Sequence, residues 1–344
     1  MSKPAAERPA MPDAKAPAAA GRLTMADLAE LAQVSKITVS RALRNSPTVK
    51  PDTRARIQAL AKEHGYKLNL SARSLRLQRS NTVAVVVEMK PSPDRPLSDP
   101  FPMALMGGIC QELTSIGYAV VLTTRDGVQA PAVQTADGII LLGQGSHDEA
   151  VAQLADGDVP LIVWGAEAAG HDYVTVGSDN RQGGILAARH LLSSGRRRGL
   201  FLGDTSHAEI EQRHGGFRDA LAQGGGILAG TVSCPFAIQA GSDAIAGWID
   251  GGGAPFDCLL AASDMLAIGA MQALQERGLP VPEAVSVIGY DDTPLGACLT
   301  PPLSSVHQDW QAGGELLARN ILAMINGEDV QSVSLPTRLV VRGT

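Results

Sequence analysis

Five residues near the N-terminus follow one another at helical spacing and carry side chains that can contact bases. They are Lys36, Ile37, Ser40, Arg41 and Arg44, and the spacing places them on one face of a helix, opposite apolar residues. In a major groove, Arg41 can bind a guanine edge through two hydrogen bonds, Lys36 can reach guanine acceptors, and Ile37 can contact a thymine methyl. The face therefore indicates a helix that reads DNA, the alternative being a solvated basic surface.

Four further polar residues have side chains suited to phosphate oxygens: Thr24, Ser35, Thr38 and Asn45. Phosphate contacts position a protein on DNA without specifying sequence. The charge of the chain is divided in a matching way. Residues 22–79 hold twelve Lys or Arg against four Asp or Glu, although the whole chain has a formal charge of -6. A basic segment on an acidic body indicates that only the first part binds a polyanion such as DNA.

Three short helices are expected to position these side chains. Thr24 and Asp27 have the spacing of a capping box at the start of a helix over 24–32. Ser35 can cap a second helix that ends near residue 43, and a third begins near Pro51 and ends at Gly65. Three helices with a tight turn between the first two describe a helix-turn-helix unit.

Beyond Asn81 the pattern changes to apolar runs that alternate with helical stretches. The expected strands are 83–87, 119–123, 138–142, 161–164, 200–203, 258–262 and 285–289, and the expected helices include 103–116, 182–193, 212–222 and 265–277. Continuous apolar strands between helices are typical of parallel sheets covered on both faces. So many strands favour an α/β core of two doubly wound lobes. Ligands bind such sheets beyond the carboxyl ends of the strands, so the expected site is a cleft between the lobes.

The sequence argues against several other classes of protein. No apolar run is long enough to cross a bilayer, and the first 21 residues, rich in Ala and Pro, lack the apolar stretch of a secretory signal and are expected to form a disordered tail. The four cysteines lie far apart and form no C-x-x-C pair, so free thiols are expected. The chain contains no Walker loop, no G-x-S-x-G elbow and no H-E-x-x-H, and its seven histidines show no ligand spacing. Neither an enzyme, nor a metal site, nor a cofactor is expected.

The segment Leu23–Ser46 resembles the helix-turn-helix of the lac repressor (LacI/GalR) family, and its second helix looks like that of gluconate-type repressors. The similarity extends over most of the chain, through Val49, Thr53–Arg54, Gly65–Tyr66, Asn69–Leu75, Gly177–Asn180, His190–Leu192, Gly195–Arg196, Arg213–Phe217, Ser263–Gly269, Val285–Asp292 and Pro301–Leu303. It implies a core of periplasmic-binding-protein type.

The resemblance also implies a hinge helix within residues 69–79. In the family this segment folds on operator DNA, which assigns DNA contacts to Ala72, Arg73, Leu75 and Arg76. Leu75 would be the wedge between base pairs in the minor groove, where unstacking is offset by bending the duplex against more protein surface. The alternative is a plain polar linker.

In the core, the resemblance places effector contacts at seven positions: Phe101, Trp164, Arg213, Phe236, Ser263, Asp291 and Trp310. Aromatic faces suit the C–H surfaces of a sugar, while Arg213 and Asp291 can fix hydroxyl or carboxylate groups. Two features depart from the family. Ser263 stands where Asn is usual, and residues 124–137 are too short for the usual extra helix.

These expectations divide the chain into a disordered tail (1–21), a helix-turn-helix domain (22–68), a hinge helix or linker (69–79) and a core (80–344) that binds effector and dimerises. The first lobe is expected over about 82–177 and 308–330, and the second over about 178–307 and 331–344. The predicted function is repression, in the cytoplasm, of an operon for sugar or sugar-acid catabolism, by a homodimer bound to palindromic DNA. An exported sugar-binding protein and a sugar-processing enzyme are the alternatives. The sequence leaves open whether the effector releases DNA or tightens its binding.

Overall fold

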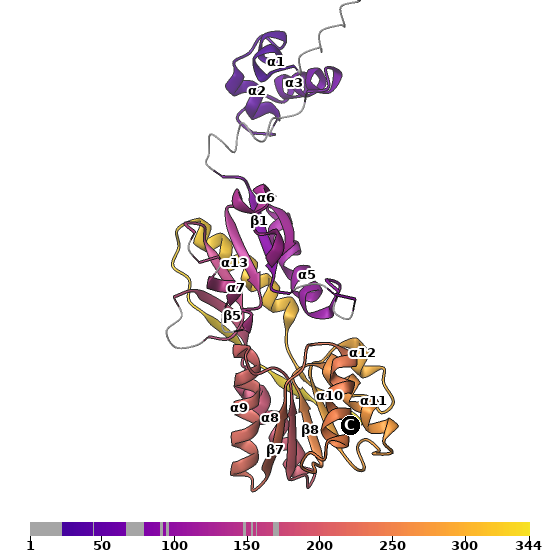
Figure 1. The fold of residues 1–344 in the computed structure, drawn as a ribbon. Coiled ribbons are helices and arrows are strands. Elements are labelled where there is room, and N and C mark those ends of the chain that lie inside the picture. The colour runs from indigo at the N-terminus through magenta and orange to yellow at the C-terminus, as the bar shows by residue number, and fades with distance from the viewer. Residues whose placement is uncertain are drawn as a thin grey trace, which may run out of the picture. The chain divides into compact units, whose positions relative to one another are not determined.

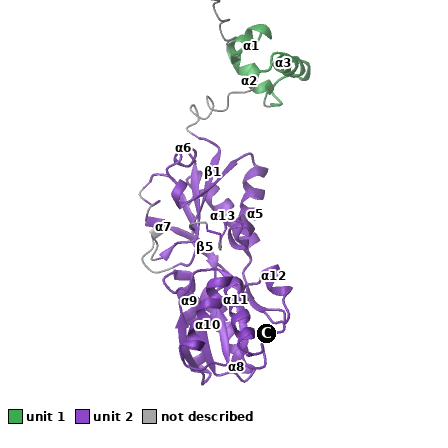
Figure 2. Ribbon diagram, turned by 45° about the vertical axis from the view of Figure 1, so that its right-hand side comes forward, with its two compact units in different colours: residues 1–77 green, residues 78–344 purple. Residues whose placement is uncertain are grey.

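The computed structural model describes residues 23–43, 45–66, 79–89, 92–93, 96–146, 149–152, 154–155, 157–167 and 172–344. The chain forms two compact units, residues 1–77 and 78–344 (Figure 2). The expected tail (1–21) and nearly all of the expected hinge (69–79) lie outside the described residues.

The first unit is built from the three expected helices, α1 (Met25–Leu31), α2 (Lys36–Leu43) and α3 (Pro51–Glu63) (Figure 1). The capping box forms as predicted, since the Thr24 hydroxyl accepts from the Asp27 amide at 3.3 Å and the Asp27 carboxylate accepts from the Thr24 amide at 2.8 Å. Ser35 likewise accepts from the Thr38 amide at 3.2 Å. The core of the unit includes Leu28, Val39 and Ile57, each fully buried. The predicted helix-turn-helix is confirmed.

The first lobe of the second unit is a six-stranded parallel sheet in the order β11-β5-β4-β3-β1-β2. Its strands are β1 (Thr82–Val87), β2 (Ala119–Thr124), β3 (Gly138–Leu142), β4 (Leu161–Trp164), β5 (Val174–Ser178) and β11 (Val333–Leu335). Helices α5 (Pro100–Ser115) and α13 (Trp310–Ile325) pack side by side and share one apolar core with the sheet. The short elements η1 (Arg125–Gly127), α6 (Pro131–Gln134) and α7 (Glu149–Ala152) complete the lobe.

The second lobe has a sheet in the order β12-β10-β9-β8-β6-β7. Its strands are β6 (Arg198–Leu202), β7 (Ile227–Val232), β8 (Cys258–Ala261), β9 (Ser286–Asp291), β10 (Ser304–His307) and β12 (Arg338–Val340), and only the β10–β12 pair is antiparallel. Two helix pairs flank it, α8 (Asn180–Ser193) with α9 (Ala208–Gln223), and α10 (Ile238–Asp250) with α11 (Asp264–Glu276), followed by the short α12 (Pro294–Ala297) (Figure 1). The predicted pair of doubly wound lobes is confirmed.

The chain passes between the lobes three times, after β5, after β10 and after β11. The third passage differs from the division expected for 331–344, which placed that whole segment in the second lobe. β11 pairs with β5 and belongs to the first sheet, whereas β12 pairs with β10 in the second. No helix among the described residues is long and apolar enough to cross a membrane.

Candidate functional site

One face of α2 is exposed and carries the residues expected to read bases. Ile37 is 64% exposed, more than any other large apolar residue that the structure describes, and Lys36 and Arg41 are exposed beside it. Val39 and Ala42, on the opposite face, are buried in the three-helix core. The fold therefore presents this face to a partner without any rearrangement of the core.

The other expected DNA contacts around α2 have local roles as well. Ser40 and Thr38 are half-buried, and the Thr38 hydroxyl lies 2.9 Å from that of Ser35. Thr24 is held by the capping box. Asn45 adopts a left-handed conformation (φ 56°) and accepts a hydrogen bond from the Gln58 side chain at 2.7 Å. The expected hinge contacts Ala72, Arg73, Leu75 and Arg76 lie outside the described residues.

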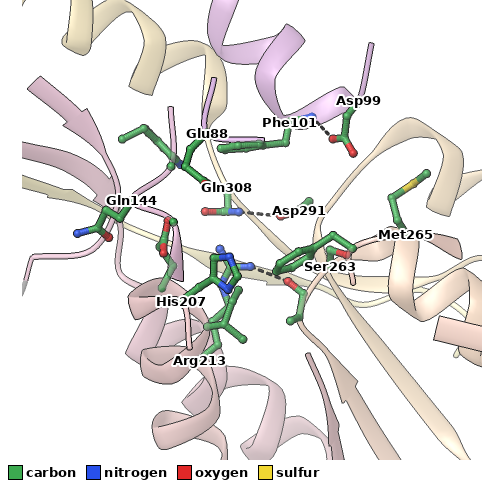
Figure 3. Close-up of a pocket in the computed structure, with 17 residues that line it drawn as sticks. Glu88, Asp99, Phe101, Gln144, His207, Arg213, Ser263, Met265, Asp291 and Gln308 are labelled. Atoms are coloured by element: carbon green, nitrogen blue, oxygen red, sulfur yellow. Dashed lines mark hydrogen bonds between the residues drawn. The ribbon is translucent and has the colours of Figure 1, made fainter. Parts of the chain in front are cut away.

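A cavity lies between the two lobes of the core, with a volume of about 730 Å³ counted to its mouth (Figure 3). Glu88 follows β1, Trp164 ends β4, Ser263 lies just after β8 and Asp291 ends β9, so the cavity sits at the carboxyl ends of strands in both sheets. This is the position expected for a ligand site in doubly wound lobes.

Six of the seven expected effector contacts line this cavity: Phe101, Trp164, Arg213, Phe236, Ser263 and Asp291. The seventh, Trp310, is not among the lining residues. It is buried behind Phe101, with the two rings edge to face and their centroids 5.9 Å apart. Trp310 therefore supports a ring that lines the cavity.

Arg213 lies at the base of the cavity on the second lobe, and its side chain is tightly held (Figure 3). Its Nε donates to the Asn180 side-chain oxygen at 2.8 Å, and its Nη1 donates to the Ala262 carbonyl at 2.6 Å. The guanidinium stacks on the Tyr290 ring, 3.8 Å from the centroid. Gly184 lets α8 approach the backbone of α9 at Arg213, because a Cβ there would overlap the Arg213 carbonyl. The charge is thus fixed in place before any ligand arrives.

Asp291 occupies a strained position at the end of β9. Its φ is 114° and that of Asp292 is 58°, in the region that side chains other than Gly avoid. The Asp291 carboxylate accepts from the Gln308 side chain at 2.7 Å, which ties the cavity to the segment passing between the lobes after β10. Burial raises the pKa of Asp291 well above its ordinary value, and the nearby Arg213 charge opposes that rise. Such strain is typical of sites held in place for binding.

Ser263 and Asp264 organise the floor of the cavity at the start of α11. The Ser263 hydroxyl accepts from the Leu266 amide at 3.3 Å and caps the helix. The buried Asp264 carboxylate accepts from the Thr293 amide at 2.6 Å, from the Thr293 hydroxyl at 2.8 Å and from the Ser305 hydroxyl at 2.6 Å. Asp264 therefore fixes the loop that follows the strained pair of aspartates.

This buried carboxyl predicts an unusual pH dependence. Burial raises the pKa of Asp264 from 3.8 to about 6, and the hydrogen bonds from Ser305 and Thr293 only partly offset it. The protonated form is favoured in the folded state, so its stabilisation is complete below pH 4 and is lost as the pH rises to about 6, by roughly 2–3 kcal/mol at most. The variant Asp264→Asn should lose this decline when free energies of unfolding are measured between pH 4 and 7. An unchanged profile in the variant would contradict the assignment.

Several residues that line the cavity were not predicted from the sequence: Glu88, Asp99, Gln144, His207, Glu209, Met265 and Gln308. Glu88 directly follows an expected strand. Because ligands bind beyond the carboxyl ends of such strands, its position could have been predicted. Asp99, Glu209 and Gln308 carried no such signal. Glu88 pairs with Arg125 at 3.0 Å, and one Glu209 oxygen is buried without a hydrogen bond among the described residues. Burial raises the pKa of Glu209.

The cavity has the chemistry of a binding site for a polar organic molecule. Three aromatic rings offer flat apolar faces, while carboxyl, amide and guanidinium groups converge around them. Within the part of the chain that the structure describes, no group of three or more His, Cys, Asp or Glu could hold a metal ion.

Two family models match the chain. Residues 24–69 match "Bacterial regulatory proteins, lacI family", and residues 188–344 match "Periplasmic binding protein-like domain". Among curated relatives, the transcriptional regulator CelR of Thermobifida fusca is 33% identical over 338 residues, covering 93% of this chain and 98% of CelR. The ribose operon repressor of Haemophilus influenzae is 28% identical, covering 93% and 97%.

Solved structures show the same similarity. The lac repressor dimer bound to operator and the anti-inducer ONPF aligns with a TM-score of 0.81 and 25% identity, covering 93% of this chain and 98% of that one. The CelR–cellobiose complex aligns with a TM-score of 0.69 and 30% identity, covering 93% and 99%. The similarity thus spans both compact units.

Proposed function

Because the chain belongs to the LacI family of bacterial regulatory proteins, we propose that it represses genes for carbohydrate use and that a sugar in the cavity between its lobes controls its binding to DNA. It is a sequence-specific DNA-binding transcriptional regulator. The observation that carries the proposal is the exposed face of α2. Lys36, Ile37 and Arg41 are exposed on this face, while the opposite face of the helix is buried in the three-helix core. Its relatives are regulators of transcription, so we assign it no catalytic activity. It acts in the cytoplasm, where its operator lies.

We assign operator binding to a homodimer. One helix-turn-helix covers a half-site only, and two-fold symmetry matches an inverted repeat. The lac repressor, similar over both units, was solved as a dimer on operator DNA. Ala72, Arg73, Leu75 and Arg76 are assigned to the hinge contacts, with Leu75 as the minor-groove wedge. The likeness of α2 to gluconate-type repressors bears on the operator sequence, because this helix contacts bases and not effector.

The cavity favours a neutral sugar over a sugar acid. Four carboxyl groups line it, from Glu88, Asp99, Glu209 and Asp291, and Arg213 is the one guanidinium among its described lining residues. Arg213 already donates to Asn180 and to the Ala262 carbonyl. Burial already disfavours the ionised form of Asp291 and Glu209, so a further carboxylate would be costly to bury beside them, whereas hydroxyl groups can hydrogen-bond to these carboxyls. A solved structure of a transcriptional regulator CelR, 30% identical to this chain, is a complex with cellobiose, a neutral sugar.

The proposed function is tested by selecting binding sites from random duplex DNA and measuring gel shifts with and without sugars. We expect an inverted repeat to be selected, and a neutral sugar to change the affinity for it while the matching uronic acid does not. A sugar that is consumed during the incubation would point instead to an enzyme. Failure to enrich any DNA sequence would refute regulation of transcription.

A further inference from the structure

A second cavity, of about 1320 Å³ counted to its mouth, opens next to the first one. Three loops or helix ends of the second lobe form most of its wall. They are the loop after β6 with Asp204 and His207, the loop after β7 from Ser233 to Ala237, and the first turns of α10 with Gln239 and Asp243. This outer cavity thus also lies at carboxyl ends of strands, where doubly wound sheets bind ligands.

The two cavities share a boundary made of two rings. His207 and Phe236 line both of them, and the rings meet edge to face with their centroids 5.6 Å apart. The Asp204 carboxylate lies 3.6 Å from His207 Nδ1, on the side of the outer cavity. His207 and Phe236 therefore face both cavities and stand between them.

The outer cavity has the chemistry of a site for a neutral, hydroxyl-rich ring. The Gln239 amide donates to Asp243 at 2.8 Å, which places a donor group and an acceptor side by side at the first turns of α10. Burial raises the pKa of the Cys234 thiol to about 11, so this wall residue is neutral. None of the lining residues that the structure describes is Lys or Arg, so a phosphate or a sugar acid finds no counter-charge. Ring edges, amides and carboxylates together suit the C–H and O–H groups of a sugar.

We propose that the outer cavity is a second sugar subsite, and that the effector is a neutral oligosaccharide of at least two units, one in each cavity. The inference rests on the proposed function, because it extends the sugar site assigned to the inner cavity. His207 and Phe236 then contact both units at the glycosidic linkage. Gln239 and Asp243 determine the preference for length and leave the inner unit untouched.

Calorimetry on the full chain tests the proposal with three named series of sugars: glucose, cellobiose and cellotriose; glucose, maltose and maltotriose; and xylose, xylobiose and xylotriose. In the series that binds, the disaccharide should bind at least about tenfold more tightly than its monosaccharide, since a second ring adds contacts without a second cost of association. The double variant Gln239→Ala/Asp243→Ala should remove most of this advantage and leave the affinity for the monosaccharide unchanged.

Gln223→Ala is the matched control, because Gln223 is exposed at the far end of α9, away from the cavity. It should change neither affinity. The inference is overturned if monosaccharide and disaccharide bind equally well, or if the double variant weakens both to the same degree. Binding of the monosaccharide alone would still leave the proposed function standing. Binding of no sugar of any length would overturn both.

Discussion

Replacing Arg213 with Ala should abolish the binding of effector and lower the stability of the core by roughly 3 kcal/mol. The guanidinium donates to Asn180 and to the Ala262 carbonyl and stacks on Tyr290, so its removal leaves two buried acceptors without their donor. Loss of its charge also leaves the buried Asp291 carboxyl without the favourable neighbour that opposes the rise of its pKa. Calorimetry with the bound sugar and thermal unfolding together measure the two losses.

Two variants separate binding from stability in this experiment. Arg218→Ala removes an exposed arginine of the same helix that pairs with Asp219, so its effect on stability should stay within about 0.5 kcal/mol. Arg213→Lys keeps the charge but lacks the planar fork, and should be intermediate in stability and still poor in binding. Below the unfolding temperature, operator affinity without sugar should persist in all three variants, since Arg213 lies in the core unit. A sugar response that survives in Arg213→Ala would remove this residue from the site.

Replacing Arg41 with Ala should cost about 1–3 kcal/mol per half-site, or about thirtyfold or more in affinity for a dimer on two half-sites. Arg41 is exposed on α2, so the core around Val39 and Ala42 should fold unchanged. The loss of affinity should be confined to the selected operator, and the variant should show a weaker preference at one base pair in each half-site. Competition against operators with single base-pair substitutions measures this preference.

A charge-matched control shows whether Arg41 reads a base or only neutralises phosphate. Lys62→Ala removes one positive charge from the exposed end of α3, and any effect it has should be equal on operator and random duplexes. Arg41→Ala should instead leave random DNA nearly unaffected. Equal losses on both kinds of DNA in Arg41→Ala would show that the residue contacts the backbone.

Local signals explain why many of the helices and several strands could be predicted from the sequence, although α10 and α13 were not named among the expected helices. The capping box of Thr24 and Asp27 is complete within four residues, and the run Val83–Val87 is apolar on both faces, as a central parallel strand requires. Strands β5, β7, β10 and β11 carried no such signal and were not among the expected strands. In β10, Ser304 and Ser305 are fully buried, yet their hydroxyls bond Thr344 and Asp264, residues about forty positions away. Only the tertiary structure makes those serines suitable for a strand.

Expected positions both inside and outside the family motifs line the cavity, since Phe101, Trp164 and Phe236 lie outside the matching segments. Arg213 and Asp291 lie within long matching segments, and both line the cavity. Trp310 was expected to contact the ligand, but it packs behind Phe101. A sequence match does not distinguish a residue that lines a cavity from one that packs behind the lining. Glu209 lines the cavity because it lies in the first turn of α9, and Gln308 lines it because it lies where the chain passes between the lobes after β10. Their roles follow from the path of the chain and not from a local pattern.

The three passages of the chain between the lobes also bear on the order in which the core is completed during synthesis. Helix α13 and strand β11, which finish the first lobe, are translated only after most of the second lobe. Until then Leu105 and Ile140 lack the helix that packs over them, because α13 shares their apolar core. The first lobe therefore cannot be completed ahead of most of the second lobe on the ribosome. The part of its apolar core that α13 covers stays open to chaperones until α13 and β11 have emerged.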